Sequence, residues 1–316
     1  MRIRNIKKNQ LAAWMFAGLS APVAQIAGGM PWQTVALIAG ACLSVCWLLG
    51  RMELAPAKWL CIIEYVWLVC LLGSMASWIS DSWTAGAVYP AVPLILLVLG
   101  GASAFRGTEN GARTGSTLFW LIGLVYVGVI VAGAGEVDPR ELAVRSGDID
   151  ARLIAVLLIP CLTVFLKEEE GKIAARGLLG IFIFAVLVSV LVTGALSLPV
   201  AADADAPLHE WVEGLSLAGT LQRFEAVVSM ALTMGWFVLL SHLIVAAGRL
   251  TECVKAGAHS KGCWAAVAGA GVLVIFERGL SPTALAVGCV LLWVAVPAVW
   301  VLIDRNKNIK ILKNNA

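Results

Sequence analysis

The stretch FAGLSAPVAQIAGG, residues 16–29, lies inside the first apolar run of the chain and places helix-breaking residues near its middle. Proline lacks an amide hydrogen and clashes with the preceding helical turn. Glycine in a helix interior costs about 1 kcal/mol relative to alanine. Gly18, Ser20 and Pro22 therefore predict that the first helix is interrupted at residues 18–22.

The composition is that of a membrane protein. Hydrophobic residues make up 60% of the 316 positions, and only 14% of the residues are charged. Apolar runs of about 20 residues, long enough to cross about 30 Å of hydrocarbon, follow one another along the chain. Ten transmembrane helices are expected, at residues 10–28, 31–50, 59–80, 88–105, 115–134, 149–166, 175–199, 224–247, 262–279 and 281–303.

The basic residues predict an orientation for these spans. If both termini lie in the cytoplasm, 18 of the 23 Lys and Arg residues fall in cytoplasmic segments and 5 in outer ones. Cytoplasmic loops of membrane proteins carry such an excess. Two outer loops are long, residues 135–148 and 200–223. Residues 208–221 are amphipathic enough to lie on the outer membrane surface, with an ordinary solvated loop as the alternative.

Ten spans divide into two halves of five, and an odd number of spans places the halves in opposite orientations. The fold class expected is thus an all-α membrane protein with a 5+5 inverted repeat and a broken first helix. The first repeat covers residues 1–148. The second covers residues 149–316 and ends in a short basic cytoplasmic tail.

In inverted-repeat transporters the ligand lies where the first helix of each repeat is interrupted. Here Ser20 could cap a second half-helix whose first turn contains Pro22, leaving amide groups free to bind a carboxylate. The expected ligand-binding residues of this segment are Gly18, Leu19, Ser20, Ala21, Pro22 and Val23. The alternative is a proline kink packed against a neighbouring helix. The sixth span fits less well, because its breakers are Gly147 at the outer edge and Pro160 toward the inner end. Gly147 is nevertheless counted among the expected ligand-binding residues. There the SGDID stretch could cap a helix starting near Asp150.

Few other polar residues lie within spans. Glu64 is a candidate functional acid, with an ion pair near Lys58 as the alternative, and Tyr65 beside it joins the expected ligand site. His242 could relay protons or make a hydrogen-bonded helix contact. Thr233 could face the ligand or bond to a carbonyl of its own helix.

Catalytic and metal chemistry are not expected. The eight cysteines are scattered without a CxxC pair, and small apolar positions within helices explain them. The chain has no phosphate-binding loop and no nucleophile elbow. We therefore expect no enzyme, no cofactor and no nucleic-acid partner.

Three segments resemble the GerAB-type spore germination permeases. Residues 194–248 combine a glycine near the end of the seventh span, an outer amphipathic segment and the RFE motif of Arg223 and Glu225 opening the eighth span. The N-terminal IKKNQLAAWMF and residues 89–113, with Gly107 and Arg113, are also similar to that family.

The resemblance implies the ten-helix, LeuT-like fold of the amino acid–polyamine–organocation superfamily. It implies binding of a small nutrient, usually an L-amino acid, between spans 1, 3, 6 and 8. It also implies partner A and C subunits of a germinant receptor in the spore inner membrane. Arg223, Glu225 and Pro160 are then expected to support structure or coupling rather than contact the ligand. Two alternatives remain at this stage: an amino-acid secondary transporter, and a structural subunit that has lost its ligand site.

Overall fold

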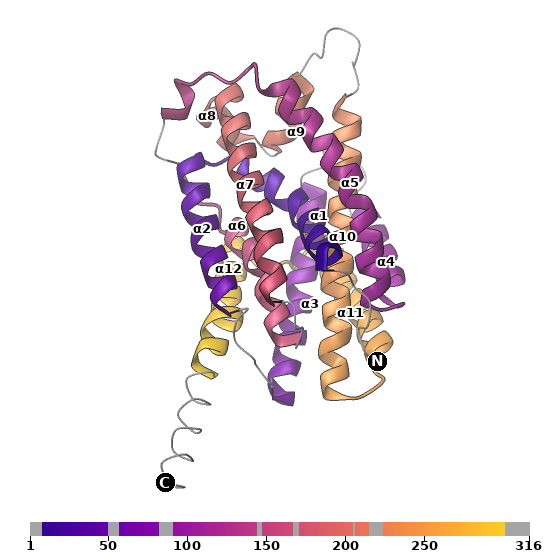
Figure 1. Cartoon of the computed structure of the whole chain (residues 1–316). Coiled ribbons are helices and arrows are strands. Elements are labelled where there is room, and N and C mark those ends of the chain that lie inside the picture. Colours follow the sequence, from indigo (N-terminus) through magenta and orange to yellow (C-terminus); the bar gives the residue numbers. More distant parts are fainter. Residues whose placement is uncertain are drawn as a thin grey trace, which may run out of the picture.

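The computed structural model of the chain describes residues 8–49, 57–81, 91–143, 147–166, 171–204, 206–214 and 224–300. Throughout these residues the regular structure is helical, and the long helices run side by side in one bundle (Figure 1). The elements are α1 (Lys8–Ala27), α2 (Trp32–Leu49), α3 (Lys58–Asp81), α4 (Ala91–Ala104), α5 (Thr108–Gly133), η1 (Glu141–Ala143), α6 (Ala151–Leu158), η2 (Ile159–Leu166), α7 (Gly171–Leu196), α8 (Leu198–Asp203), α9 (Pro207–Gly214), α10 (Phe224–Val254), α11 (His259–Ile275), α12 (Pro282–Val290) and η3 (Leu291–Ala295).

Each of the ten expected spans coincides with a helical segment, counting α6 with η2 and α12 with η3 as one segment each. By length and composition, six of the described helices are able to cross a membrane: α2, α3, α5, α7, α10 and the segment Pro282–Trp300. Three further apolar helices are shorter, at Ala91–Ala104, Ala151–Leu162 and His259–Ile275. These features are those of a helical, multi-pass membrane protein.

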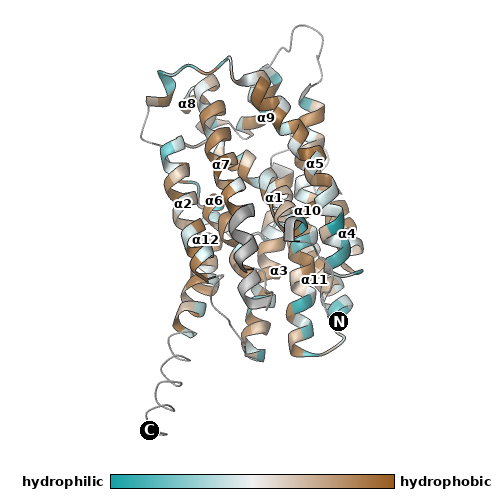
Figure 2. Cartoon of the chain, in the orientation of Figure 1, coloured by the Kyte–Doolittle hydropathy of each residue, from teal (hydrophilic) through white to brown (hydrophobic). Residues whose placement is uncertain are grey.

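The long helices at the edge of the bundle consist largely of hydrophobic residues (Figure 2). In α5 the side chains of Trp120, Leu124 and Val131 are each at least 70% exposed and recur every four to seven residues along one face. Such a face is unfavourable in water and suits hydrocarbon. By contrast, α10 is the most buried of the six long helices and forms the centre of the bundle.

The connecting segments gather at two opposite ends. At one end the rings of Trp59 and Trp300 lie 6.3 Å apart, and Tyr65 donates a hydrogen bond to the carbonyl of Gly262. We call this the basic end, defined by Lys58, Arg106, Arg113, Arg249, Lys255 and Lys261. The opposite end carries η1, α8 and α9 (Figure 1). We call it the α8/α9 end.

Several helix-to-helix contacts occur in matching pairs. Helix α1 packs against α5, and α6 packs against α12. The contact of α4 with α10 is matched by that of α3 with α11. The contact of α1 with α7 is matched by that of α6 with α2. The contacts of α1 and α5 with α10 have no equally extensive counterpart. Most of these contacts are therefore interchanged in pairs if α1 is exchanged with α6, α2 with α7, α3 with α10, α4 with α11 and α5 with α12.

The expected interruption of the first helix is wrong, because α1 is one helix from Lys8 to Ala27 with Pro22 inside it. The Ser20 hydroxyl donates to the carbonyl of Ala17 three residues earlier and does not cap a new helix. Small residues serve packing instead. A Cβ added to Gly235 of α10 would lie 2.6 Å from the Cβ of Ala21, so both helices depend on small side chains here. The alternative of a proline-containing helix packed against its neighbour fits this arrangement.

The irregular helices are the sixth and the tenth. As expected, Asp150 caps α6, and its carboxylate accepts from the amide of Arg152 at 2.8 Å. After eight residues the α-helix gives way to the eight-residue 3₁₀ helix η2, whose second residue is Pro160. In the tenth span, η3 is a π-helix of five residues. Departures of this kind inside helices frequently mark hinges or functional sites.

The second predicted outer loop contains a short amphipathic helix, α9 (Pro207–Gly214), whose apolar face packs on the protein. Helix α9 buries one face against the bundle, formed by Pro207, Leu208, Trp211 and Val212. The ring of Trp211 fits against Gly133, where an added Cβ would clash. The rest of the predicted amphipathic stretch, residues 215–221, lies outside the described residues, as does Arg223.

Candidate functional site

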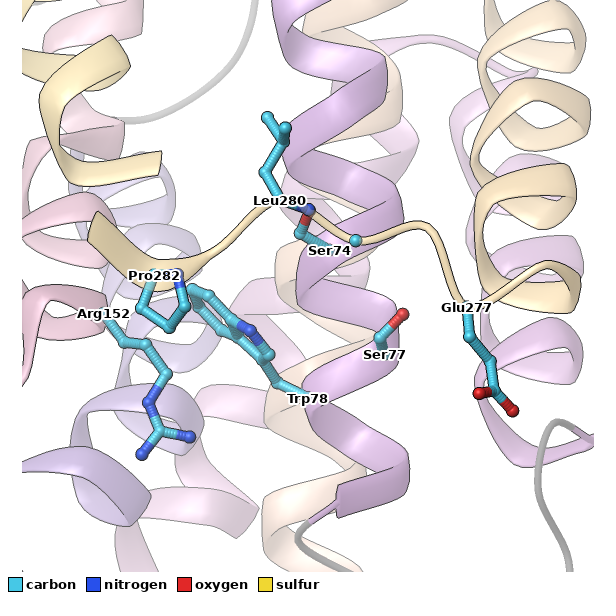
Figure 3. Close-up of a pocket in the computed structure, with 8 residues that line it drawn as sticks. Ser74, Ser77, Trp78, Arg152, Glu277, Leu280 and Pro282 are labelled. Atoms are coloured by element: carbon cyan, nitrogen blue, oxygen red, sulfur yellow. The ribbon is translucent and has the colours of Figure 1, made fainter. Parts of the chain in front are cut away.

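A cavity of about 470 Å³ opens at the α8/α9 end of the bundle. It lies between the last turns of α3, the first turn of α6 and the segment that joins α11 to α12 (Figure 3). Its volume falls within the range of small-molecule sites in proteins. The lining residues are Ser74, Ser77, Trp78, Arg152, Glu277, Gly279, Leu280 and Pro282.

One serine fixes the wall formed by the α11–α12 segment. The amide of Leu280 donates to the Ser74 hydroxyl at 2.9 Å, and that hydroxyl donates in turn to the carbonyl of Cys70. Beyond Leu280, Ser281 caps α12 and Pro282 occupies its first turn, where a proline is well tolerated. Segments about 200 residues apart in the sequence are thus joined at the cavity wall.

Arg152 is the cation of the cavity. Its Nε and one Nη nitrogen bond to one carboxylate oxygen of Asp150, at 2.7 and 2.6 Å. The side chain is 37% exposed. A guanidinium group has five N–H donors, so these two contacts leave donors for a carboxylate or phosphate of a ligand. The position of Arg152 follows from the cap at Asp150, which starts α6 at the rim of the cavity.

The two charged residues of the lining stand apart. Figure 3 shows Arg152 beside Trp78 and Pro282, whereas Glu277 lies on the other side of α3, toward Ser77. Glu277 has a positive φ of 51°, a left-handed conformation that costs a non-glycine residue roughly 1–2 kcal/mol. Strained backbone of this kind tends to cluster at binding sites. The cavity therefore offers a cationic part next to an indole ring and a separate acidic part.

The predicted ligand site at mid-bundle is almost closed. Gly18 and Leu19 line a cavity of about 10 Å³, together with Pro160 of η2 and His242 of α10. That volume is close to the minimum for one water molecule. His242 contacts the ring of Trp14 edge-on, at 4.4 Å between centroids, and its Nδ1 has no hydrogen-bond partner among the described groups. The expected hydrogen-bonded helix contact of His242 is thus replaced by an aromatic one.

The remaining predicted site residues are dispersed. Thr233 bonds to the carbonyl of Ser229 in its own helix, the alternative anticipated for it, and Tyr65 joins α3 to α11. Gly147 lies beside Pro31 in an outer connection, where an added Cβ would be 2.8 Å from the proline ring. Glu225 occupies the first turn of α10, where the helix dipole favours an acid.

The expected ion pair of Glu64 with Lys58 is wrong. The Glu64 side chain is fully buried and takes part in none of the ion pairs among the described residues. Instead its Oε2 accepts a hydrogen bond from the indole of Trp293 at 2.8 Å. The described residues also contain no cluster of three or more His, Cys, Asp or Glu side chains that could hold a metal ion.

Sequence reasoning missed the residues of the cavity at the α8/α9 end and the partner of Glu64. Arg152 was counted only as one of the basic residues of the predicted outer segments. The local signal for Arg152 was its place two residues after Asp150, the last residue of the SGDID stretch. For Trp293 the sequence contains no such signal, because its partner lies 229 residues away.

Comparison of the chain with known proteins gives no assignment. No protein-family model matches the chain. No curated protein matches it either. The function must therefore be argued from the geometry of the cavity and from the pattern of the sequence.

Proposed function

We propose that this protein is a membrane subunit that binds a small nutrient carrying a carboxylate, an L-amino acid, in the cavity at the α8/α9 end. The observation that carries the proposal is the placement of Arg152 in the wall of a 470 Å³ cavity, beside the indole of Trp78. Arginine binds carboxylates through paired N–H donors, and an indole offers an apolar surface for a side chain. The two together suit an amino acid better than a lipid or a macromolecule.

This proposal places the ligand in the cavity at the α8/α9 end and not beside residues 18–22, where the sequence predicted it. The continuous backbone of α1 leaves no free amide groups there for a carboxylate. The Gly18–His242 region at mid-bundle then serves as the packed interior that separates the cavity from the basic end.

The fold that we propose is the inverted repeat, with α1–α5 as one half and α6, α7, α10, α11 and α12 as the other. The recurring helix pairs described above support it. The start of α6 at Ala151, directly after its Asp150 cap, agrees with a boundary between residues 148 and 149. The distribution of basic residues supports placing both termini and the basic end in the cytoplasm.

The biological role that we propose is that of a germinant receptor B subunit in the spore inner membrane. There it would assemble with A and C subunits and respond to the nutrient by a conformational change or ion release. The support is the sequence resemblance of residues 194–248 and of the N-terminal segment. An amino-acid transporter with the same site is the alternative, and net uptake into proteoliposomes would distinguish the two.

A second candidate function is favoured by one specific observation. The cavity at mid-bundle holds about one water molecule, and α1 has no exposed helix end beside it. A subunit that assembles a complex without binding a ligand would have such an interior. If no amino acid from a complete panel binds to the purified protein, alone or with its partners, this structural role replaces the ligand-binding one.

The test of the site compares matched variants and matched ligands. We expect Arg152→Gln to weaken binding of the amino acid by about tenfold or more, since a hydrogen bond to a charged group contributes about 1.5–3 kcal/mol. The amide of the same amino acid, which lacks the carboxylate, should be affected little. Isothermal titration calorimetry on the full chain in detergent measures both.

Two control variants sharpen the result. Arg140→Gln removes an exposed positive charge from the same end of the bundle but outside the cavity, so it should leave binding unchanged. Glu277→Gln reports whether the ligand is long enough to reach the acidic part of the cavity. Equal weakening by Arg152→Gln and Arg140→Gln would mean that only overall charge matters, and equal loss for the amide would exclude carboxylate recognition.

A further inference from the structure

Glu64 is a buried acid that forms no ion pair with any residue that the structure describes. Its side chain has 0% exposure, one oxygen accepts from Trp293, and the other oxygen, Oε1, has no partner among the described groups. Transferring an ionised carboxylate into an apolar interior costs so much that such a group takes up a proton instead. The packing of Glu64 therefore favours the neutral acid.

The side chains around Glu64 favour a proton over a metal cation as the species that it binds. The titratable side chains beside it are the thiols of Cys61 on α3 and Cys289 on α12. Its hydrogen-bond donor is an indole N–H. The helices α4, α10 and α11 also pack against α3, and none of their described side chains forms an ion pair with Glu64. Alkali and alkaline-earth cations require several oxygen ligands, whereas the polar side chains that the structure describes beside Glu64 are an indole and two thiols. A proton needs only the carboxylate.

The backbone next to Glu64 is suited to a change of shape. Trp293 is the central residue of the π-helix η3, and it is itself fully buried. One turn earlier, Gly288 of α12 accommodates the ring of Trp67, where an added Cβ would overlap the indole. A π-helical turn contains one inserted residue relative to an α-helix, and this insertion can shift along the helix. Such turns are commonly found at functional sites. Movement of η3 away from α3 would separate Trp293 from Glu64.

We propose that Glu64 is a proton-binding site that couples the protonation state of the protein to the contact between α3 and η3. With α3 and η3 packed together, the neutral acid is held by Trp293. When they separate and water enters, the carboxyl group gives its proton to water and becomes a carboxylate. Glu64 lies six residues into α3, about 9 Å along the helix from the basic end, so the proton reaches that end. This inference goes beyond the proposed nutrient site and does not depend on it.

Infrared spectroscopy of the purified full chain tests the proposal without any ligand. A protonated carboxylic acid has a C=O stretching band that a carboxylate lacks. We expect this band at pH 7 in the wild-type protein, its loss in Glu64→Gln, and its retention in Glu109→Gln. Glu109 is the matched control because it is an exposed helical acid paired with Arg113. Absence of the band from the wild-type protein, or its survival in Glu64→Gln, would overturn the proposal.

A second variant keeps the acid and changes only its partner. Trp293→Phe removes the N–H donor, so the C=O band should move to higher frequency while its intensity remains. This measurement decides the question even if Glu64→Gln fails to fold. An unchanged band position in Trp293→Phe would show that the observed acid is not Glu64. Failure of the amino-acid binding test leaves these spectra unaffected, so the two proposals fail separately.

Discussion

Gly18 of α1 stands against the backbone of Leu239 of α10: a Cβ added to Gly18 would lie 3.2 Å from both the amide nitrogen and the Cα of Leu239. Backbone atoms cannot move aside as a flexible side chain can. The glycine therefore sets how closely the first helix approaches the central helix of the bundle.

We predict that Gly18→Leu destabilises the protein by about 1–3 kcal/mol or prevents its accumulation, as overpacking of a close helix contact does. Thermal unfolding of the purified protein in detergent, followed by size-exclusion chromatography, measures the loss. The control is Gly123→Leu in α5, because nothing lies within 4 Å of a Cβ there. If Gly18→Leu were as stable as this control and lost only nutrient affinity, the ligand would lie beside α1 after all.

A second prediction concerns the wall of the cavity at the α8/α9 end. Ser74→Ala removes the acceptor of the Leu280 amide and should release the α11–α12 segment, at a cost of about 1 kcal/mol. Hydrogen exchange at Leu280 should then accelerate about fivefold. Ser77→Ala is the matched control, since the Ser77 hydroxyl bonds only to the carbonyl of Gly73 in its own helix. Equal exchange in the two variants would show that Ser74 does not hold the segment.

Asp150 combines two interactions that two substitutions can separate. Asp150→Asn keeps a capping side chain for the amide of Arg152 but loses the carboxylate that holds the guanidinium. Asp150→Ala loses both and should cost about 1 kcal/mol more through the missing cap. Thermal unfolding compares their stabilities. The same stability for both variants would mean that the cap contributes nothing to the start of α6.

Cys253 provides a test of the proposed orientation. It is the exposed cysteine among the eight, and it lies near the end of α10 at the basic end. A membrane-impermeant maleimide should label it in inside-out vesicles and leave it unlabelled in right-side-out vesicles. A Glu213→Cys, Cys253→Ser variant should give the opposite pattern, because Glu213 is exposed on α9. Labelling of Cys253 from outside would reverse the orientation.

The sequence predicted the helices well because hydropathy is a local property. The positions of the ten helical segments, the cap at Asp150 and the start of the amphipathic helix α9 all follow from neighbouring residues. The interpretation of Gly18, Ser20 and Pro22 was wrong for a physical reason. Glycine weakens a helix but is also the smallest residue, and here Gly18, with Ala21 beside Gly235, allows α10 to pack closely against α1.

The sites could not be predicted to the same degree. The cavity at the α8/α9 end exists because the α11–α12 segment folds back onto α3, a contact between residues 74 and 280 that leaves no local pattern. For Glu64, the sequence pointed correctly to an unusual intramembrane acid. It suggested Lys58, however, because that residue is close in sequence, whereas Trp293 is close only in space.

The 3₁₀ geometry of η2 has a consequence for the length of the sixth helical segment. Eight residues of α6 and eight of η2 extend about 28 Å, since the rise per residue is about 1.5 Å in an α-helix and about 2.0 Å in a 3₁₀ helix. Sixteen residues of α-helix would extend only about 24 Å. The tighter winding thus stretches a short segment to nearly the thickness of the hydrocarbon layer. Rewinding η2 as an α-helix would shorten it by about 4 Å and turn its far end by about 160°, a screw-like displacement with its pivot at Pro160.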